Sequence, residues 1–186
     1  ALSESPLDEN LIVIGTDDGL IQITENSGKT WRKIDNIPDA PEQSYVNSVY
    51  LSQHDVNVIY VAFNHHKYGD FKPYIFKSSD RGNSWVSISS NLPIRGSVYS
   101  IEEDHVDSNL IFCGTEFGVF FSPDSGGNWK ELANGLPTIA VRDIAIQRRE
   151  NDLVLGTFGR GFYVLDDYSV LRSIKNSEKN PAAQIF

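Results

Sequence analysis

The stretch Ser122-Pro-Asp124-Ser-Gly126-Gly-Asn128-Trp129 decides the fold, because its pattern occurs three times in the chain. The other two copies run from Thr24 to Trp31 and from Ser78 to Trp85. Each copy has a hydroxyl residue, then Asp or Asn, then Gly, a small polar residue and Trp. Asp and Asn accept hydrogen bonds from nearby backbone N–H groups, and Gly readily adopts positive φ. Each copy therefore predicts a tight turn between two strands.

Short strands surround each of these turns. Around the third copy, strands are predicted at 98–102, 110–115, 118–122 and 129–132, with no helix. We call these strands a, b, c and d. The same order recurs in the second repeat and, without an evident d strand, in a fourth repeat: 46–51, 58–63, 74–77 and 85–88, then 141–146, 153–157 and 162–165. The first repeat has its b strand at 11–16, and its a strand is clipped.

Antiparallel four-stranded repeats that cannot bury both faces alone predict β-propeller blades stacked around an axis. The three tryptophans are 54 and 44 residues apart, which is close to the length of a blade. We therefore expect an all-β chain with about four consecutive blades of a larger propeller, followed by an irregular tail. The expected ranges are 1–40, 41–93, 94–136 and 137–170 for the blades and 171–186 for the tail.

The residues that repeat in the turns are interpreted as scaffold, because a feature present in successive repeats is structural by default. Each tryptophan is expected to pack its flat face on the neighbouring blade. The structural set is Asn26, Gly28, Trp31, Asp80, Gly82, Trp85, Asp124, Gly126 and Trp129.

Composition excludes several classes of function. The chain has 186 residues, with 16 Lys and Arg against 25 Asp and Glu, a net charge of −9 that disfavours nucleic acid and anionic lipid as partners. The longest apolar run, 58–63, is too short to insert into a membrane. Cys113 is the only cysteine, so no internal disulfide forms. The chain starts at Ala1 and has no methionine, so we expect a processed chain or an excised segment.

The three turns resemble the Asp-box, or bacterial neuraminidase repeat, found in sialidases, xyloglucan-degrading hydrolases, photosystem assembly factors and sortilin-type receptors. Segments 5–7 with 11–19, and 141–144 with 151–167, are similar to the closing blades of large bacterial secreted proteins. Those proteins resemble the sortilin N-terminal domain and are often labelled glycosyl-hydrolase-like. The resemblance covers nearly the whole chain and implies a larger parent propeller and a secreted or periplasmic location. It supplies no catalytic residue.

Two functions remain open at this stage. The first is a non-catalytic interaction scaffold that binds a protein or a glycan. The alternative is part of a glycoside hydrolase whose active site needs blades, or a second propeller, missing from this chain. Asp17, Asp18 and Glu116 lie at predicted b–c turns and could supply the carboxylate pair of such an enzyme, although turn chemistry alone explains them. A sialidase is disfavoured, because Pro93-Ile94-Arg95 reverses the Arg-Ile-Pro order of that family.

A ligand site is expected on the face formed by the b–c and d–a loops, opposite the Asp-boxes. The b–c loop of the second repeat, 64–73, is 7 or 8 residues longer than its counterparts, and binding is usually carried by such loops. The candidate ligand-binding residues are Asp18, His65, His66, Tyr68, Asp70, Glu116 and Arg160. A tolerated insertion and a solvated turn arginine are the alternatives.

The sequence predicts no catalytic residue, metal site or cofactor. Adjacent side chains such as those of His65 and His66 diverge, and no third metal ligand has a recognisable spacing. We expect them to be exposed loop histidines. The end blades should leave apolar faces uncovered, so we expect self-association through the terminal blades, or closure into a small propeller.

Overall fold

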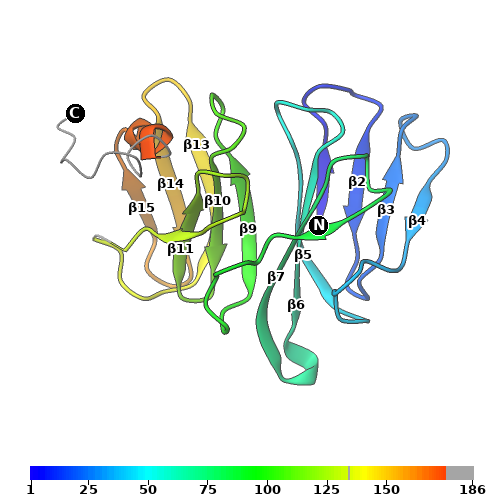
Figure 1. The fold of residues 1–186 in the computed structure, drawn as a ribbon, viewed down its shortest axis with the longest axis horizontal. Coiled ribbons are helices and arrows are strands. Elements are labelled where there is room, and N and C mark those ends of the chain that lie inside the picture. The colour runs from blue at the N-terminus through cyan, green and yellow to red at the C-terminus, as the bar shows by residue number, and fades with distance from the viewer. Residues whose placement is uncertain (134, 175–186) are drawn as a thin grey trace.

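The computed structural model describes residues 1–133 and 135–174, and their strands form four antiparallel sheets. Each sheet consists of strands that follow one another in the sequence, so each is one propeller blade. Figure 1 shows blades 1 and 2 on the right and blades 3 and 4 on the left. The prediction of an all-β chain built from antiparallel blades is confirmed.

Blades 1 to 3 have four strands each and blade 4 has three. Blade 1 contains β1 (Leu2–Glu4), β2 (Ile12–Gly15), β3 (Ile21–Thr24) and β4 (Arg32–Ile34); blade 2 contains β5 (Tyr45–Leu51), β6 (Ile59–His65), β7 (Asp70–Ser78) and β8 (Val86–Ser87). Blade 3 contains β9 (Val98–Glu103), β10 (Ile111–Thr115), β11 (Gly118–Ser122) and β12 (Lys130–Glu131); blade 4 contains β13 (Val141–Gln147), β14 (Asp152–Thr157) and β15 (Phe162–Leu165).

Two 3-10 helices correct the expectation of strands alone. The first, η1 (His66–Tyr68), caps the β6–β7 hairpin, whose strands continue to the His65–Asp70 pair. The insertion at 64–73 is therefore a lengthened hairpin rather than an irregular loop, and Figure 1 shows it projecting below the sheets. The second, η2 (Tyr168–Ser173), follows blade 4 and includes the start of the expected tail; residues 175–186 lie outside the described part of the chain.

The Asp-box turns are closed by their own side chains. In the third copy, the buried Ser122 hydroxyl donates to Asp124 Oδ1 at 2.7 Å and accepts from the backbone N–H of Gly126 at 2.8 Å. Asp124 Oδ1 also accepts from the backbone N–H of Asn128 at 2.7 Å. The copies built on Thr24 and Ser78 contain equivalent bonds. The repeated hydroxyl is thus the buried centre of each turn.

A second repeat, which the sequence analysis missed, connects the a–b turn of a blade to its Asp-box. It has the form Asp-x-Asn: the aspartate accepts from the backbone N–H and the side-chain amide of the asparagine, whose backbone carbonyl accepts from the box. In blade 3, Asn109 O accepts from the Ser125 N–H at 2.8 Å. Both turns of a blade are therefore tied together at one end of the sheet.

Three apolar clusters fill the spaces between successive blades. One lies between blades 1 and 2, the second between blades 2 and 3, and the third between blades 3 and 4. Trp85 and Trp129 are only 7% and 4% exposed, and Trp129 Nε1 donates to Ile88 O of blade 2 at 2.7 Å. Trp31 is 40% exposed, because Trp85 and Trp129 pack on the preceding blade and the structure describes no blade before blade 1. The expected packing is thus absent at Trp31.

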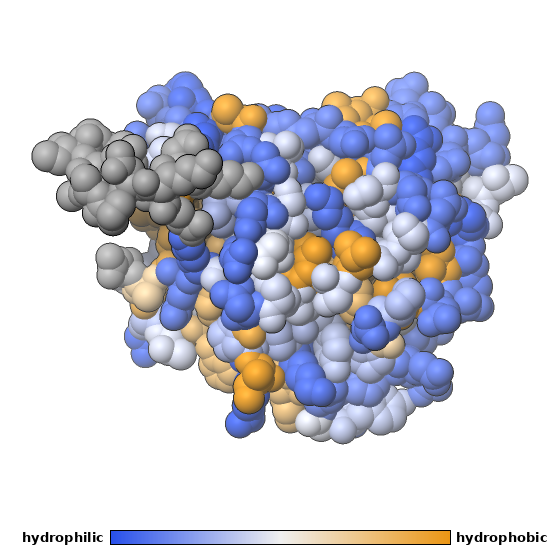
Figure 2. Space-filling view, viewed as in Figure 1, coloured by the Kyte–Doolittle hydropathy of each residue, from blue (hydrophilic) through white to orange (hydrophobic). Residues whose placement is uncertain are grey.

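On the face shown in Figure 2 most of the surface is hydrophilic, and apolar side chains reach it at several separate places. None of the helices in the described ranges is long and apolar enough to cross a membrane.

Buried acidic residues connect blade 3 to the chain on both sides of it. Glu103 Oε2 accepts from the Ser52 hydroxyl at 2.7 Å and the Gln53 N–H at 3.0 Å in blade 2. The two Asp104 carboxylate oxygens accept from Nε and Nη2 of Arg172 in η2, each at 2.8 Å. Because buried carboxylates need such partners, these bonds fix blade 2 and η2 against blade 3.

Glu102 gives the fold a pH dependence of its own. Burial raises the pKa of its carboxyl to about 7, although the positive charge of Arg148 opposes this. An acid whose pKa is higher in the folded state contributes stability below its unfolded value near 4.5 that is lost as pH rises through 7. The unchanged protein should therefore lose on the order of 1 to 3 kcal/mol of its free energy of unfolding between pH 5 and 8, and Glu102→Gln should not show this loss. Urea unfolding of both proteins at pH 5 and pH 8 measures the difference. If the free energy of unfolding changed equally with pH in both proteins, the raised pKa of Glu102 would not be the cause.

Candidate functional site

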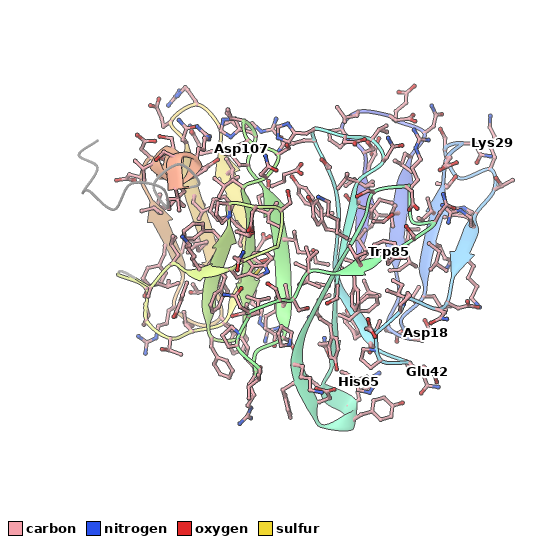
Figure 3. The ribbon with its side chains drawn as sticks, viewed as in Figure 1. Asp18, Lys29, Glu42, His65, Trp85 and Asp107 are labelled. Carbon is pink, nitrogen blue, oxygen red and sulfur yellow. The ribbon has the colours of Figure 1, made fainter. Side chains whose placement is uncertain are left out.

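The two ends of the blades differ in what they present. Figure 3 places Asp18, Glu42 and His65 at one end, and Lys29 of the first Asp-box and Asp107 of an a–b turn at the other. The b–c turns and d–a loops thus share a face, which we call the b–c face. The Asp-boxes lie at the opposite end, as the sequence predicts.

A groove of about 470 Å³ opens on the b–c face beside blades 1 and 2. The b–c turn of blade 1 (17–20), the d–a loop (35–43) and the insertion of blade 2 form its walls. Four carboxylates and one lysine line it: Asp17, Asp18, Asp35, Glu42 and Lys67. Lys33 lies 3.4 Å from Asp35. The groove is therefore acidic and favours ligands that donate hydrogen bonds or carry positive charge.

Tyr68 supplies the exposed aromatic wall of this groove. The residue is 59% exposed, its ring stacks on His65 with 4.4 Å between ring centroids, and its hydroxyl donates to Gln43 Oε1 at 2.5 Å. His65 Nδ1 lies 3.0 Å from the hydroxyl of the buried Ser44. The tyrosine ring is thus held in place from two sides while one face stays open to a ligand.

The two adjacent histidines brace the insertion rather than form a metal pair. His66 Nε2 lies 2.7 Å from the hydroxyl of Ser97, before blade 3, whereas His65 reaches Ser44, before blade 2. Both histidines are half-buried, so the expectation of exposed loop histidines was wrong. Across residues 1–133 and 135–174, no group of three or more His, Cys, Asp or Glu side chains could hold a metal ion.

Two of the predicted carboxylates are held in the charged form by neighbouring hydroxyls. The Thr16 hydroxyl donates to Asp18 and lowers the pKa of its carboxyl. The Tyr74 hydroxyl donates to Asp70 at 2.6 Å and likewise lowers its pKa. Asp18 lines the groove, whereas Asp70 is used within its own hairpin and is not among the lining residues. The structure therefore brings Asp18 and Tyr68 together and leaves Asp70 aside.

Glu116 and Arg160 lie at the b–c turns of blades 3 and 4, on the same face but outside the lining of the groove. The Glu116 backbone N–H donates to Ser97 O at 3.1 Å. Arg160 sits between Gly159 and Gly161, whose φ values are 83° and 71°. They share a face with the groove without sharing its cavity.

Most of the exposed aromatic rings lie on the b–c face, and the sequence analysis named only Tyr68 among them. In the part of the chain that the structure describes, seven aromatic side chains are exposed, and six lie at this end: Tyr45, Tyr68, Phe71, Phe117, Phe158 and Phe162. The seventh is Trp31 in the first Asp-box. Arg142 stacks over Tyr99 at 3.7 Å and lies 5.3 Å from the Phe158 ring centroid. An aromatic residue one or two positions after the Gly-Thr pair was the available signal in blades 3 and 4.

The search of protein-family models and the search of curated proteins each found no match to this sequence. Solved structures do match it. An ancestral GH74 enzyme aligns with TM-score 0.69 and 21% identity, over 90% of this chain and 24% of that protein. The GH74 enzyme of Niastella koreensis aligns with TM-score 0.70 and 12% identity, over 91% and 28%. YCF48 bound to D1 peptide aligns with TM-score 0.64 and 17% identity, over 90% and 55%.

At these identities the comparisons establish the fold. The chain spans about a quarter of the GH74 enzymes and about half of YCF48. The resemblance to part of larger propellers of the hydrolase and photosystem-factor kind is thereby confirmed. Solved structures with this fold include an extracellular domain from B. thetaiotaomicron, at 18% identity.

Proposed function

We propose that this chain is a non-catalytic interaction scaffold that binds a protein or glycan ligand on the b–c face. The observation that carries the proposal is the collection of exposed aromatic rings at this end, beside the acidic groove. Exposed aromatic side chains present apolar area to water, and a bound partner that covers this area is stabilised by its burial. Such side chains are enriched where proteins bind partners. The Asp-box end carries only Trp31 among the exposed rings of the described residues.

The shape and charge of the groove support a ligand that lies along Tyr68. Its open ring offers a flat surface to the C–H face of a sugar or to a Lys or Arg side chain. The carboxylates of Asp18 and Glu42 beside it accept hydrogen bonds from sugar hydroxyls or from cationic groups. Neither contact requires a catalytic step. YCF48 is a propeller of the same fold that binds a peptide, which supports the protein-ligand form of the proposal.

Tyr68→Ala tests the proposal directly. We expect it to weaken binding at least tenfold, because the exposed ring is lost while the hairpin strands remain; tenfold is about 1.4 kcal/mol. Trp31→Ala is the matched control, an exposed ring at the opposite end, and should bind as the unchanged chain does. Binding is measured on arrays of plant and bacterial polysaccharides and of Lys- and Arg-rich peptides. Removing the whole hairpin tip is a poorer test, since His65 and His66 brace buried serines.

The same binding experiment distinguishes the scaffold from the second candidate function, part of a glycoside hydrolase. The carboxylates that line the groove favour it, because such enzymes use two carboxyl groups around the bond. Release of reducing ends from a bound polysaccharide, abolished by Asp18→Asn, would support the hydrolase. Saturable binding without bond cleavage supports the scaffold. Absence of binding on both arrays, or equal binding by Tyr68→Ala, would overturn the proposed function.

A further inference from the structure

Among residues 1–133 and 135–174, no strand pairs with the outer edge of β15, the last strand of blade 4. The sheet order of this blade is β13-β14-β15, whereas the c strand of each other blade pairs with a d strand. Phe162, Val164 and Leu165 of β15 are 79%, 56% and 38% exposed. β15 lies at the edge of the molecule in Figure 1. A strand edge with free N–H and C=O groups and apolar side chains is a template for another strand.

The other blades show what chemistry occupies the equivalent position. Their d segments share one spacing, in which Trp precedes Ile or Leu by three residues: Trp31 to Ile34, Trp85 to Ile88 and Trp129 to Leu132. In blade 3 the segment pairs with β11, where Phe120 is opposite Glu131 and Phe121 opposite Lys130. The pairing of Gly114 with Val119 in blade 3 matches that of Gly156 with Phe162 in blade 4. Tyr163 and Val164 therefore correspond to Phe120 and Phe121.

A groove of about 450 Å³ lies beside this edge, where the tryptophan of a d segment would pack. Between blades 2 and 3, Trp129 packs with Ile88, Leu92 and Phe120, and all four are buried. Between blades 3 and 4, the matching residues Leu132, Leu136 and Tyr163 line the groove and are only partly buried. The residues that would surround a tryptophan are therefore in place between blades 3 and 4. Within the described residues, no d segment of blade 4 supplies that tryptophan.

The backbone of β15 is also oriented for pairing. Gly161 O accepts from the Thr157 N–H at 3.0 Å, so the backbone groups of Gly161 and Tyr163 face β14. Because backbone groups alternate along a strand, those of Phe162 and Val164 face outward. In blade 3 the corresponding Val119 O accepts from the Leu132 N–H at 2.9 Å. The outward groups of β15 therefore match those that hold a d strand.

We infer that the outer edge of β15 and the groove beside it form a docking site for one extended β-strand. That strand runs antiparallel to β15 and carries a bulky aromatic residue three positions before Ile or Leu. The aromatic ring fills the groove against Leu132, Leu136 and Tyr163, and the backbone bonds to Phe162 and Val164. Within the described residues, the groove beside β15 shares no lining residue with the acidic groove, and Phe162 is the one exposed ring that belongs both to the b–c face and to the edge of β15. The inference therefore does not depend on the proposed function.

The test uses the full 186-residue chain and a fluorescent peptide with the sequence of residues 126–133, Gly-Gly-Asn-Trp-Lys-Glu-Leu-Ala. We expect saturable binding by fluorescence anisotropy and slower hydrogen exchange at the Phe162 and Val164 amides. The Trp129→Ala version of the peptide should bind at least tenfold more weakly. That comparison uses the unchanged protein, so it does not depend on any variant folding.

Two protein variants locate the site. Val164→Pro removes an outward N–H but leaves the β14 side of the strand intact, and Leu136→Arg fills the groove with a charged side chain. Each should weaken peptide binding at least tenfold, while Ile94→Arg, a matched change at a residue 84% exposed on the b–c face, should not. Absence of saturable binding, equal binding of the two peptides, or binding unaffected by Val164→Pro and Leu136→Arg in folded protein would overturn the inference.

Discussion

Arg172→Met is expected to lower the free energy of unfolding by about 3 kcal/mol at neutral pH, because it leaves a buried carboxylate without its positively charged partner. The Asp104 side chain is fully buried, and the guanidinium of Arg172 donates to both of its oxygens at 2.8 Å. Tyr168 adds a 2.6 Å bond and the Asp107 N–H a 2.7 Å bond, yet neither supplies a positive charge. Urea unfolding at pH 7 measures the loss.

The pH dependence distinguishes this ion pair from simple packing. Burial raises the pKa of Asp104, but the hydrogen bonds from Arg172, Tyr168 and Asp107 outweigh it and hold the pKa at about 2. The depressed pKa contributes stability that is present above the unfolded value and is lost as pH falls through 2. Without Arg172 that pKa rises, so the deficit of the variant should shrink between pH 7 and 4.

Arg149→Met is the matched control for this change. The Arg149 side chain is 81% exposed, and its 2.8 Å pair with Glu150 is fully solvated. Exposed pairs of this kind contribute about 0 to 1 kcal/mol. If both variants lost the same stability, or if the deficit of Arg172→Met did not change with pH, the buried ion pair would not be the anchor of η2.

The blades were predictable from sequence because their signals are local. The hydroxyl, the Asp or Asn and the Gly of each Asp-box bond to one another within about six residues, so the turn can be recognised without knowing its neighbours. The Asp104–Arg172 anchor was not predictable in this way, since its partners are 68 residues apart. The Asp-x-Asn turns are local too, but Asp, Asn and Ser are too common in loops for the pattern to stand out.

The candidate site was only partly accessible to sequence reasoning. Strand order within a blade fixes which turns share an end, so the b–c face could be predicted, and Asp18 and Tyr68 do meet in one groove. Which loops touch depends on how adjacent blades stack. For that reason the sequence analysis placed the d–a loops on this face but named no residue of the loop at 35–43, and it assigned the two histidines to solvent rather than to Ser44 and Ser97. The binding role of these residues stays a prediction.

Gly126→Ala is expected to lower the free energy of unfolding by about 2 to 4 kcal/mol, because the glycine of the third Asp-box is under two constraints. Its φ is 93°, a conformation that costs a residue with a Cβ about 1 to 2 kcal/mol. A Cβ at this position would lie 2.7 Å from Ile88 Cβ of the neighbouring blade, so the blades must also move apart. Overpacking of this kind adds about 1 to 3 kcal/mol. The box glycine thus sets the turn and the spacing between blades.

The first Asp-box offers a control with the same turn and no neighbouring blade against it. Gly28 has a φ of 84°, but the nearest atom to a Cβ there is Trp31 Cζ2 at 3.8 Å, an ordinary contact. Gly28→Ala should therefore lower the free energy of unfolding only by the contribution of the positive φ, about 1 kcal/mol. Thermal and urea unfolding of the two variants give the difference, which measures the contact between blades 2 and 3. Equal losses would mean that the glycine is required for the turn alone, and that blade stacking tolerates a methyl group at this contact.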